Sequence, residues 1–427
     1  MALLIIAVLP GCKSRTDSAH TQKVRIEKKD KKFTLYRNGK PFEIRGASGY
    51  SHFKTLKNCG GNTVRIWDTT GLQTILDSAV ANDIAVVVGL PVRHSEDLAF
   101  YNDPEKVKKQ YLAFSRLINR HKHNPAILMW CVGNELTFPV KFSYQPFYQA
   151  FNNLTDMIHR DDPNHPVTTT ILNFNQKYIA NMMLRCDIDL ISFNIFGKLP
   201  QLRQDLEDFS WFWDGPYMLL EWGINGPWPG TEQTAWSAYL EDTSWKKAEI
   251  YRERYQRDMP LKDPRFLGAS VFFWGNKQET TDTWFSLFDE NGAASEVVGT
   301  MEYLWKGKMP ATHYPDISFM LLDEKGGSDN IMLDPREVVS ARIVMPESSG
   351  DFDKIQWKVC KEDWYKQNNE NSTRRLPALP NVVVSEEGLQ ATVTAPAEEG
   401  PYRLFATVYA DNGTYATCNT PFYVVGK

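Results

Sequence analysis

Several features that would point to particular classes of protein are absent from this 427-residue sequence. Basic residues are not in excess, since the net charge is -4, so nucleic acid and anionic membrane surfaces are not indicated as partners. The six cysteines show no Cys-x-x-Cys spacing and the histidines no metal-ligand spacing, so no metal site is predicted. Internal repeats and low-complexity tracts are also absent. With 42% hydrophobic and 23% charged residues, the chain is that of a globular protein.

The N-terminal stretch MALLIIAVLPGCKS is an apolar run too short to span a bilayer, followed by small residues, as in an export signal. Its ending, residues 9–12, resembles a bacterial lipobox. We therefore expect residues 1–22 to be a signal and tether, Cys12 to be lipidated, and the protein to be exported, as an outer-membrane or cell-surface lipoprotein or to the periplasm. The alternative is a cleaved signal in which Cys12 has no role. No Lys or Arg precedes the apolar run, which departs from the usual signal.

Between residues 42 and 275, strand-like runs alternate with helix-like segments. The helical segment 103–125 begins with Asp103 and Pro104 and carries apolar residues three and four apart. The alternation predicts a closed (β/α)₈ barrel in a domain of residues 23–309. The main alternative, a doubly wound open sheet, usually has a GxGxxG first turn, and GASGYSHFK lacks it. The eight strand-like runs are 42–50, 62–68, 83–92, 126–135, 166–172, 189–197, 216–223 and 268–275.

Beyond residue 310 the pattern changes to short alternating strands separated by turns such as Asp-Asn-Gly and Ser-Ser-Gly. This predicts an immunoglobulin-like β-sandwich over residues 310–427. We expect it to support the barrel rather than to bind sugar by itself. Cys360 and Cys418 lie in this region and can pair if the protein is exported, which the sequence does not decide.

Two of the barrel runs end in a glutamate. The fourth ends in Asn134-Glu135 and the seventh in Glu221-Trp222. The C-terminal ends of barrel strands carry the reactive groups, and paired carboxylates are what glycoside hydrolysis needs. One must protonate the leaving oxygen and the other must attack the anomeric carbon. Either glutamate alone could be a salt-bridge partner inside the barrel, but two at facing strands favour a catalytic pair.

The segments around these glutamates resemble a known group of enzymes. WCVGNEL resembles the Asn-Glu motif of clan A retaining glycoside hydrolases, and LLEWG resembles the nucleophile segment of the same clan. NTVRIWD, SFNIFG, VFFWG and TWFSLFDENG are similar to segments of its family 2 barrels, so the resemblance covers roughly residues 32–306. A barrel followed by an immunoglobulin-like domain on an exported lipoprotein also resembles family 158, whose members cleave β-1,3-glucan.

The resemblance implies a role for each matching residue. Glu135 would be the general acid/base and Glu221 the nucleophile, with their carboxyl groups ~5–5.5 Å apart. Asn134 would bind the sugar 2-OH, Arg65 would keep Glu221 ionised, and Trp274 would form a platform under the sugar. The alternatives are that Arg65 binds barrel carbonyls and that Trp274 packs in the core.

One position departs from the clan pattern. Two residues after Asn194, where the clan often has a tyrosine that orients the nucleophile, this chain has Phe196. Either Asn194 or a tyrosine from another loop takes that role, or the nucleophile is held less firmly. Further candidates for substrate contact lie in the loops after the seventh and eighth runs, where the alternatives are loop packing for the tryptophans and solvation for the acids. They are Trp228, Trp236, Trp245, Glu232, Glu241, Glu279 and Asp282.

Together with the resemblance, these observations predict a monomeric, exported retaining β-glycosidase that uses no cofactor or metal and acts on an oligosaccharide or polysaccharide. The resemblance to family 158 implies, most specifically, an endo-β-1,3-glucanase. The first alternative is an exo-acting β-galactosidase, β-mannosidase or β-glucuronidase. A transglycosylase would use the same residues. A surface protein that binds carbohydrate without catalysis is a third class, which the presence of both Glu135 and Glu221 disfavours.

Overall fold

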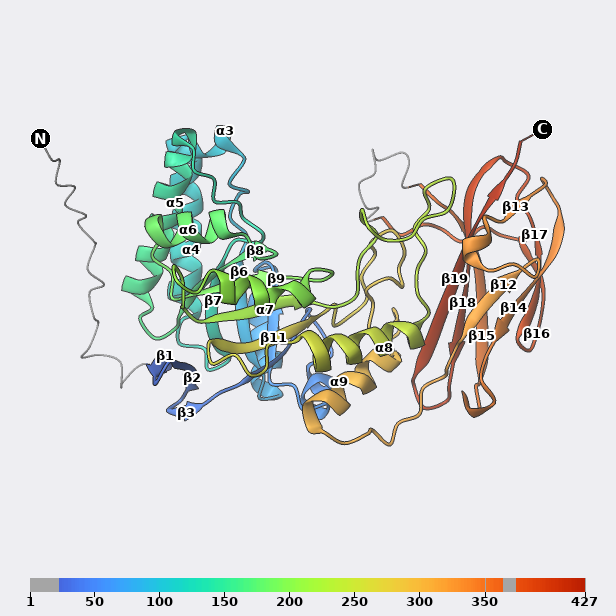
Figure 1. Ribbon diagram of the computed structural model, residues 1–427, viewed down its shortest axis with the longest axis horizontal. Coiled ribbons are helices and arrows are strands. Elements are labelled where there is room, and N and C mark those ends of the chain that lie inside the picture. The colour runs from blue at the N-terminus through green and yellow to red at the C-terminus, as the bar shows by residue number, and fades with distance from the viewer. Residues whose placement is uncertain (1–22, 350, 364–373, 427) are drawn as a thin grey trace, which may run out of the picture.

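The computed structural model describes residues 23–349, 351–363 and 374–426. The predicted signal and tether, with Cys12, lie outside this range. Figure 1 shows the two parts of the molecule, with the barrel strands β4 to β11 on one side and the strands β12 to β19 on the other. The long loops that follow β10 and β11 lie between the two parts.

Eight parallel strands close into a barrel in the order β10-β11-β4-β5-β6-β7-β8-β9, which confirms the predicted (β/α)₈ fold. Each strand overlaps one of the eight runs identified in the sequence, and β11 begins two residues before its run. Every residue of β6 and β7 is buried, which explains their almost continuous apolar sequence. The strands are β4 (Ile44–Ser48), β5 (Thr63–Ile66), β6 (Ala85–Leu90), β7 (Ile127–Val132), β8 (Val167–Leu172), β9 (Leu190–Asn194), β10 (Tyr217–Trp222) and β11 (Phe266–Phe272).

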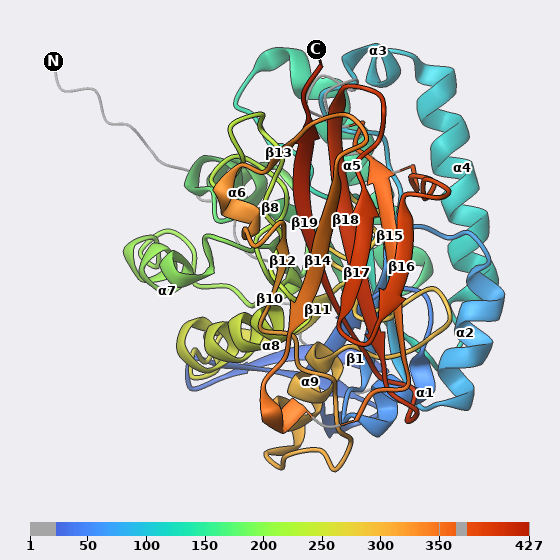
Figure 2. The same cartoon turned by 90° about the vertical axis from the view of Figure 1, so that its right-hand side faces the viewer.

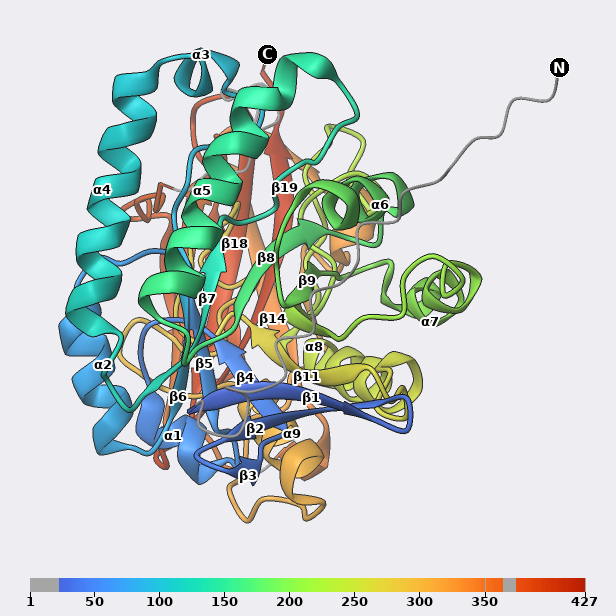
Figure 3. The same ribbon diagram turned by 90° about the vertical axis from the view of Figure 1, so that its left-hand side faces the viewer.

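Helices connect the barrel strands, and Figure 3 shows α4 and α5 running side by side along one flank of the barrel. The predicted start of α4 is confirmed, because the Asp103 side chain accepts hydrogen bonds from the amides of Glu105 and Lys106 and Pro104 occupies the first turn. The helices are α1 (Phe53–Asn58), α2 (Leu72–Ala81), α3 (Leu98–Tyr101), α4 (Pro104–His121), α5 (Gln145–Asp161), α6 (Gln176–Arg185), α7 (Leu199–Asp208), α8 (Ser244–Glu253), the π-helical turn η2 (Arg254–Asp258), and α9 (Glu296–Lys306).

A small antiparallel sheet, not predicted from the sequence, precedes the barrel. It consists of β1 (Val24–Lys29), β2 (Lys32–Arg37) and β3 (Lys40–Pro41). Val24 and Leu35 are buried in a cluster with barrel residues such as Val87 and Met218. This sheet therefore extends the apolar core of the barrel.

The C-terminal part is a β-sandwich of two four-stranded sheets, as predicted, with one apolar core built from both sheets. Figure 2 shows its long strands face on. Cys360 on β15 and Cys418 on β19 are both free, and β18 lies between their strands, so they do not form a disulfide here. One sheet holds β12 (Phe319–Leu322), β14 (Val338–Val344), β17 (Gln390–Thr394) and β16 (Val383–Glu387); the other holds β13 (Met332–Leu333), β19 (Tyr415–Val424), β18 (Gly400–Tyr409) and β15 (Lys354–Lys361).

Two features are absent from the residues that the structure describes. None of the helices there combines the length and the apolarity needed to cross a membrane. Nor do three or more His, Cys, Asp or Glu side chains come together in an arrangement that would hold a metal ion in that part of the chain.

Candidate active site

A cavity of about 960 Å³ lies at the C-terminal ends of the barrel strands. Both predicted catalytic glutamates line it, and aromatic side chains form much of its wall. Such a position is where (β/α)₈ enzymes carry their active sites. The lining residues used below are Tyr50, Trp67, Asn134, Glu135, Phe196, Lys198, Glu221, Asn225, Trp228, Phe272, Phe273, Lys277, Glu279 and Phe285.

Glu221, near the end of β10, is the more buried of the two carboxyl groups, with 5% of the residue exposed. Its Oε1 accepts three hydrogen bonds. The donors are Arg65 Nη1 at 2.5 Å, Trp67 Nε1 at 2.7 Å and Asn194 Nδ2 at 2.8 Å. All three partners are N–H donors, and none of them can accept a hydrogen bond from a protonated carboxyl group. The arrangement therefore stabilises Glu221 as a carboxylate.

Glu135 follows β7 at a sharp turn of the chain. Its φ is 52°, in the left-handed region, and Gly133 before it has a φ of 81°. The Glu135 side chain is half-buried, and its Oε1 accepts a hydrogen bond of 2.8 Å from the same Asn194 Nδ2 that binds Glu221. Because both oxygens lie 2.8 Å from Asn194 Nδ2, Glu135 Oε1 and Glu221 Oε1 can lie no further apart than the sum of these two distances. This is shorter than the ~6.5–9.5 Å that inverting glycosidases need to fit a water molecule between their carboxyl groups.

The electrostatics of the pair follow from burial and from charge. Burial raises the pKa of Glu221, to about 8; the neighbouring Arg65 guanidinium opposes this rise, and the negative charge of Glu135 adds to it. Two carboxyl groups this close repel each other when both are ionised, so the pair retains one proton near neutral pH. The three N–H donors on Glu221 favour the ionised form of that residue.

Asn134 completes the polar network. Its Oδ1 accepts hydrogen bonds from Arg65 Nη2 and, at 3.2 Å, from Asn194 Nδ2. With the carbonyl occupied in this way, the side-chain NH₂ group is the part of Asn134 that remains to bind a substrate. The predicted contact to a sugar hydroxyl would use this group.

The structure therefore brings Arg65, Asn134, Glu135, Asn194 and Glu221 together as the sequence predicted. Trp228 and Glu279 also line the cavity, and Glu279 forms an ion pair of 2.5 Å with Lys277. Trp236 and Trp245 do not line this cavity. Trp236 packs against Tyr423 of the sandwich, and Trp245 lies at a separate surface cavity beside α9.

The prediction for Trp274 was wrong. This side chain is completely buried, packs against Phe288 and Trp305, and donates to the carbonyl oxygen of His52 at 3.3 Å. It therefore cannot form a platform under a sugar. The neighbouring Phe273 lines the cavity instead, where its ring stacks on that of Trp67 at 5.5 Å between centroids.

Trp67 is the functional residue that sequence reasoning missed. Its indole N–H binds the nucleophile candidate, the task expected of the tyrosine that Phe196 replaces. The Arg65 guanidinium lies over its ring, 4.3 Å from the centroid. A signal was present in the sequence, because Trp67 stands two residues after Arg65 and strand residues two apart point to the same side.

Replacing Trp67 by Phe tests this role. We expect kcat/KM to fall about tenfold or more, because a hydrogen bond to a charged group contributes ~1.5–3 kcal/mol. The pKa of Glu221 should also rise, since a donor to its ionised form is lost. Trp274→Phe is the matched control, because it removes an indole N–H bond outside the cavity. Equal losses of activity in the two variants, measured by steady-state kinetics, would contradict the assignment.

Comparison with known proteins defines the class of the barrel. The model of the glycosyl hydrolases family 2 TIM barrel domain matches residues 61–258, a range that contains both glutamates. Residues 61–258 thus match the barrel of glycosyl hydrolases family 2, which supports the clan A glycoside hydrolase class that the sequence resemblance implied. A comparison with curated proteins gives no match.

Similar solved structures include β-glucuronidases and a β-galacturonidase. The Bifidobacterium dentium β-glucuronidase in complex with coumarin-3-O-glucuronide is 18% identical, with a TM-score of 0.52, over 66% of this chain and 49% of that one. The family 2 β-galacturonidase of Eisenbergiella tayi bound to galacturonate is 15% identical, with a TM-score of 0.51, over 67% and 54%. Bacteroides uniformis β-glucuronidase 2 is 12% identical, with a TM-score of 0.50, over 94% and 48%. The chain spans about half the length of these proteins, and at such identities the likeness shows the fold alone.

Proposed function

We propose that the protein is a retaining β-glycoside hydrolase acting on a β-glucan, as an endo-β-1,3-glucanase. The observation that carries the retaining mechanism is the Asn194 amide, which donates 2.8 Å hydrogen bonds to both Glu135 and Glu221. The close carboxyl pair that results suits a mechanism in which one carboxylate itself is the nucleophile.

The reaction then has two displacements. Glu221 attacks the anomeric carbon and forms a glycosyl ester, while the C–O bond to the leaving group breaks and Glu135 gives its proton to the departing oxygen. Glu135, now ionised, takes a proton from water as that water attacks the anomeric carbon and releases Glu221. Each displacement inverts the anomeric carbon, so the product keeps the β configuration. Arg65 and Trp67 stabilise the Glu221 carboxylate whenever it is free.

The wall of the cavity supports a neutral glucan as substrate. Rings of Trp67, Phe196, Trp228, Phe273 and Phe285 line it, and aromatic faces suit the C–H faces of a β-linked sugar chain. Its volume of about 960 Å³ is at the upper end of the ~300–1,000 Å³ of ordinary ligand pockets, which leaves room for several sugar units. The choice of the β-1,3 linkage rests on the resemblance of the domain order to family 158.

A second candidate is an exo-acting β-glucuronidase. Lys198 and Lys277 line the same cavity, and a lysine can bind the carboxylate of a uronic acid. The solved structures named above act on or bind uronides. However, Lys277 is already paired with Glu279, so at least one of the two positive charges is compensated inside the protein.

Product analysis on a panel of substrates separates the candidates. The panel contains laminarin, mixed-linkage glucan, xylan, mannan, and aryl β-glycosides that include a β-glucuronide. Short oligosaccharides from laminarin are the expected result. Monosaccharide release from one aryl glycoside alone would instead establish an exo-enzyme, and longer products than the substrate would indicate transglycosylation. Sugar binding by calorimetry without any turnover would favour the binding-only alternative.

The carboxyl pair also predicts the pH dependence of the reaction. Because the pKa of Glu221 is raised to about 8 by burial, with Glu135 adding to the rise, the pair keeps its last proton up to about that pH. We expect kcat/KM of the wild type to fall above about pH 8. In Glu135→Gln, assayed on an activated aryl glycoside, this alkaline limb should disappear and the pKa of Glu221 should fall, since the like charge is gone. A wild-type profile without an alkaline limb would contradict this assignment.

We also propose that the protein is an exported, lipid-anchored monomer. The support is the lipobox-like sequence ending in Cys12, and that residue lies outside the described structure. Metabolic labelling with a fatty acid should mark the wild type and not Cys12→Ala. Labelling of both forms, or of neither, would contradict the proposed lipid anchor on Cys12. Light scattering would measure the oligomeric state, which we expect to be monomeric.

A further inference from the structure

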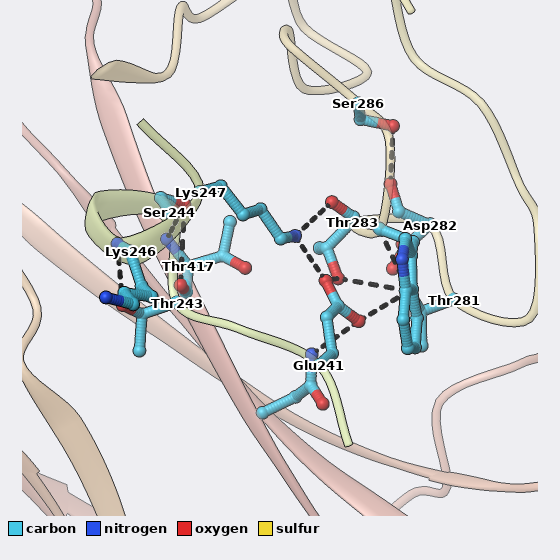
Figure 4. Close-up of polar contacts among 12 residues, drawn as sticks. Glu241, Thr243, Ser244, Lys246, Lys247, Thr281, Asp282, Thr283, Ser286 and Thr417 are labelled. Atoms are coloured by element: carbon cyan, nitrogen blue, oxygen red, sulfur yellow. Dashed lines mark hydrogen bonds and ion pairs between the residues drawn. The ribbon is translucent and has the colours of Figure 1, made fainter. Parts of the chain in front are cut away.

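Glu241 is a buried carboxylate in the loop after β10, with 1% of its side chain exposed. It accepts a hydrogen bond of 2.6 Å from Lys247 and bonds of 2.7 Å each from Thr281, Thr283 and Asn419. Figure 4 shows it between Lys247 and the threonines. Burial acts to raise the pKa of Glu241, but Lys247, the Thr281 hydroxyl and the charge of Arg403 together outweigh burial and hold this pKa below its usual value. Glu241 is therefore neither the solvated loop residue nor the substrate contact considered from the sequence.

The four donors come from separate parts of the molecule. Lys247 lies on α8, the two threonines lie in the loop after β11, and Asn419 lies on β19 of the sandwich. Asn419 is in turn held by Arg403 on β18, whose Nη1 donates to Asn419 Oδ1 at 2.6 Å. The same guanidinium donates to Tyr239 O in the loop after β10 and forms a buried ion pair of 2.7 Å with Glu362. A continuous polar network therefore joins the sandwich to Glu241.

The network continues from Glu241 to the wall of the catalytic cavity. Thr281 Oγ1, which donates to Glu241, accepts a hydrogen bond of 3.0 Å from the amide of Trp284. Trp284 Nε1 donates to Asn225 O at 2.9 Å. Asn225 lines the cavity, as does Phe285 next to Trp284. Lys277 and Glu279 belong to the same loop, and Glu279 is tied to Thr281 by backbone hydrogen bonds in both directions.

We propose that Asn419 of the sandwich is a positioning residue for the active site. Through Glu241 it fixes residues 277–285, which form one wall of the catalytic cavity, so that substrate affinity depends on the C-terminal domain. Buried hydrogen-bond networks hold their members in one arrangement, because each broken bond leaves a further unpaired polar group in a medium of low dielectric constant. The effect on substrate affinity rests on the proposed function, whereas the fixing of the loop does not.

The primary experiment is hydrogen–deuterium exchange on the full chain, which needs no substrate. In Asn419→Leu we expect exchange to increase in residues 277–285 and to stay unchanged in β6 and β7 of the barrel. Cys418→Ala is the matched control, since it alters a buried side chain of the sandwich core that does not belong to the network. The proposal is overturned if the loop exchanges as in wild type, if Cys418→Ala has the same effect, or if the whole barrel exchanges faster.

Thr281→Val removes the hydroxyl that donates to Glu241 and leaves the sandwich unchanged. This second variant keeps the test valid if Asn419→Leu does not fold. It should give the same local increase in exchange. On the substrate identified by the panel, both variants should raise KM by up to about tenfold with kcat unchanged, because a loosened cavity wall weakens binding of the substrate and of the transition state alike, and the hydrogen bond to Glu241 sets an upper limit on the loss. A fall in kcat with KM unchanged would overturn the positioning role. If the loop loosens but the wild type turns over no glycoside, the proposed function fails while the loop assignment stands.

Discussion

Replacing Glu221 by Gln is expected to abolish turnover, lowering kcat/KM by at least ~10⁴-fold on every glycoside that the wild type cleaves, because no covalent intermediate can form. Gln has the same shape and its Oε1 can still accept from Arg65, Trp67 and Asn194. Loss of activity would therefore report the missing nucleophile and not a rearranged pocket. The measurement is initial rate against substrate concentration for the wild type and the variant.

Two controls accompany this variant. Removing the negative charge leaves Arg65 buried without its ion pair, so unfolding should be easier by up to ~3–5 kcal/mol, and assays should be run well below the Tm of the variant. Glu279→Gln changes the third glutamate that lines the cavity, which the mechanism does not use, and should retain most of kcat. Turnover in Glu221→Gln close to that of Glu279→Gln would contradict the role of Glu221.

Replacing Glu135 by Gln should lower kcat about 10²–10⁴-fold on substrates with poor leaving groups, because such leaving oxygens depend on protonation. Aryl glycosides with acidic phenols need no such help, so their glycosyl-enzyme should form quickly and then accumulate. Sodium azide should restore turnover, since this nucleophile attacks the intermediate without a general base. The measurement is the burst of phenol and its steady-state rate with and without azide.

The stereochemistry of the rescued product is the sharper readout. Attack of azide on an intermediate attached to Glu221 should give the β-glycosyl azide. An α-glycosyl azide, or equal loss of activity on good and poor leaving groups, would contradict the assignment of Glu135 as acid/base.

Those parts of the fold and site that depend on local signals could be predicted from the sequence. The eight barrel strands are long apolar or β-branched runs, and their ends carried Arg65, Asn134, Glu135, Asn194 and Glu221 in order along the chain. Strand ends converge in a closed barrel, so these residues meet in space as predicted.

The failures arose where the direction of a side chain or a distant partner decides the outcome. Phe273 and Trp274 are adjacent, and only the structure shows that the first faces the cavity and the second faces the core. Glu241 looks solvated in a loop rich in Gly and Trp, but its partners Thr281 and Asn419 lie 40 and 178 residues away. No local pattern could identify such contacts.

In the proposed mechanism, Glu221 attacks the sugar and the bond is cleaved with retention. Proton NMR of the first-formed product, recorded during hydrolysis of the best substrate from the panel before mutarotation, tests this mechanism. We expect the β-anomer to appear first and the α-anomer to grow in later by mutarotation. An α-anomer at the earliest time points would show inversion, and would contradict both the covalent intermediate and the role of Glu221.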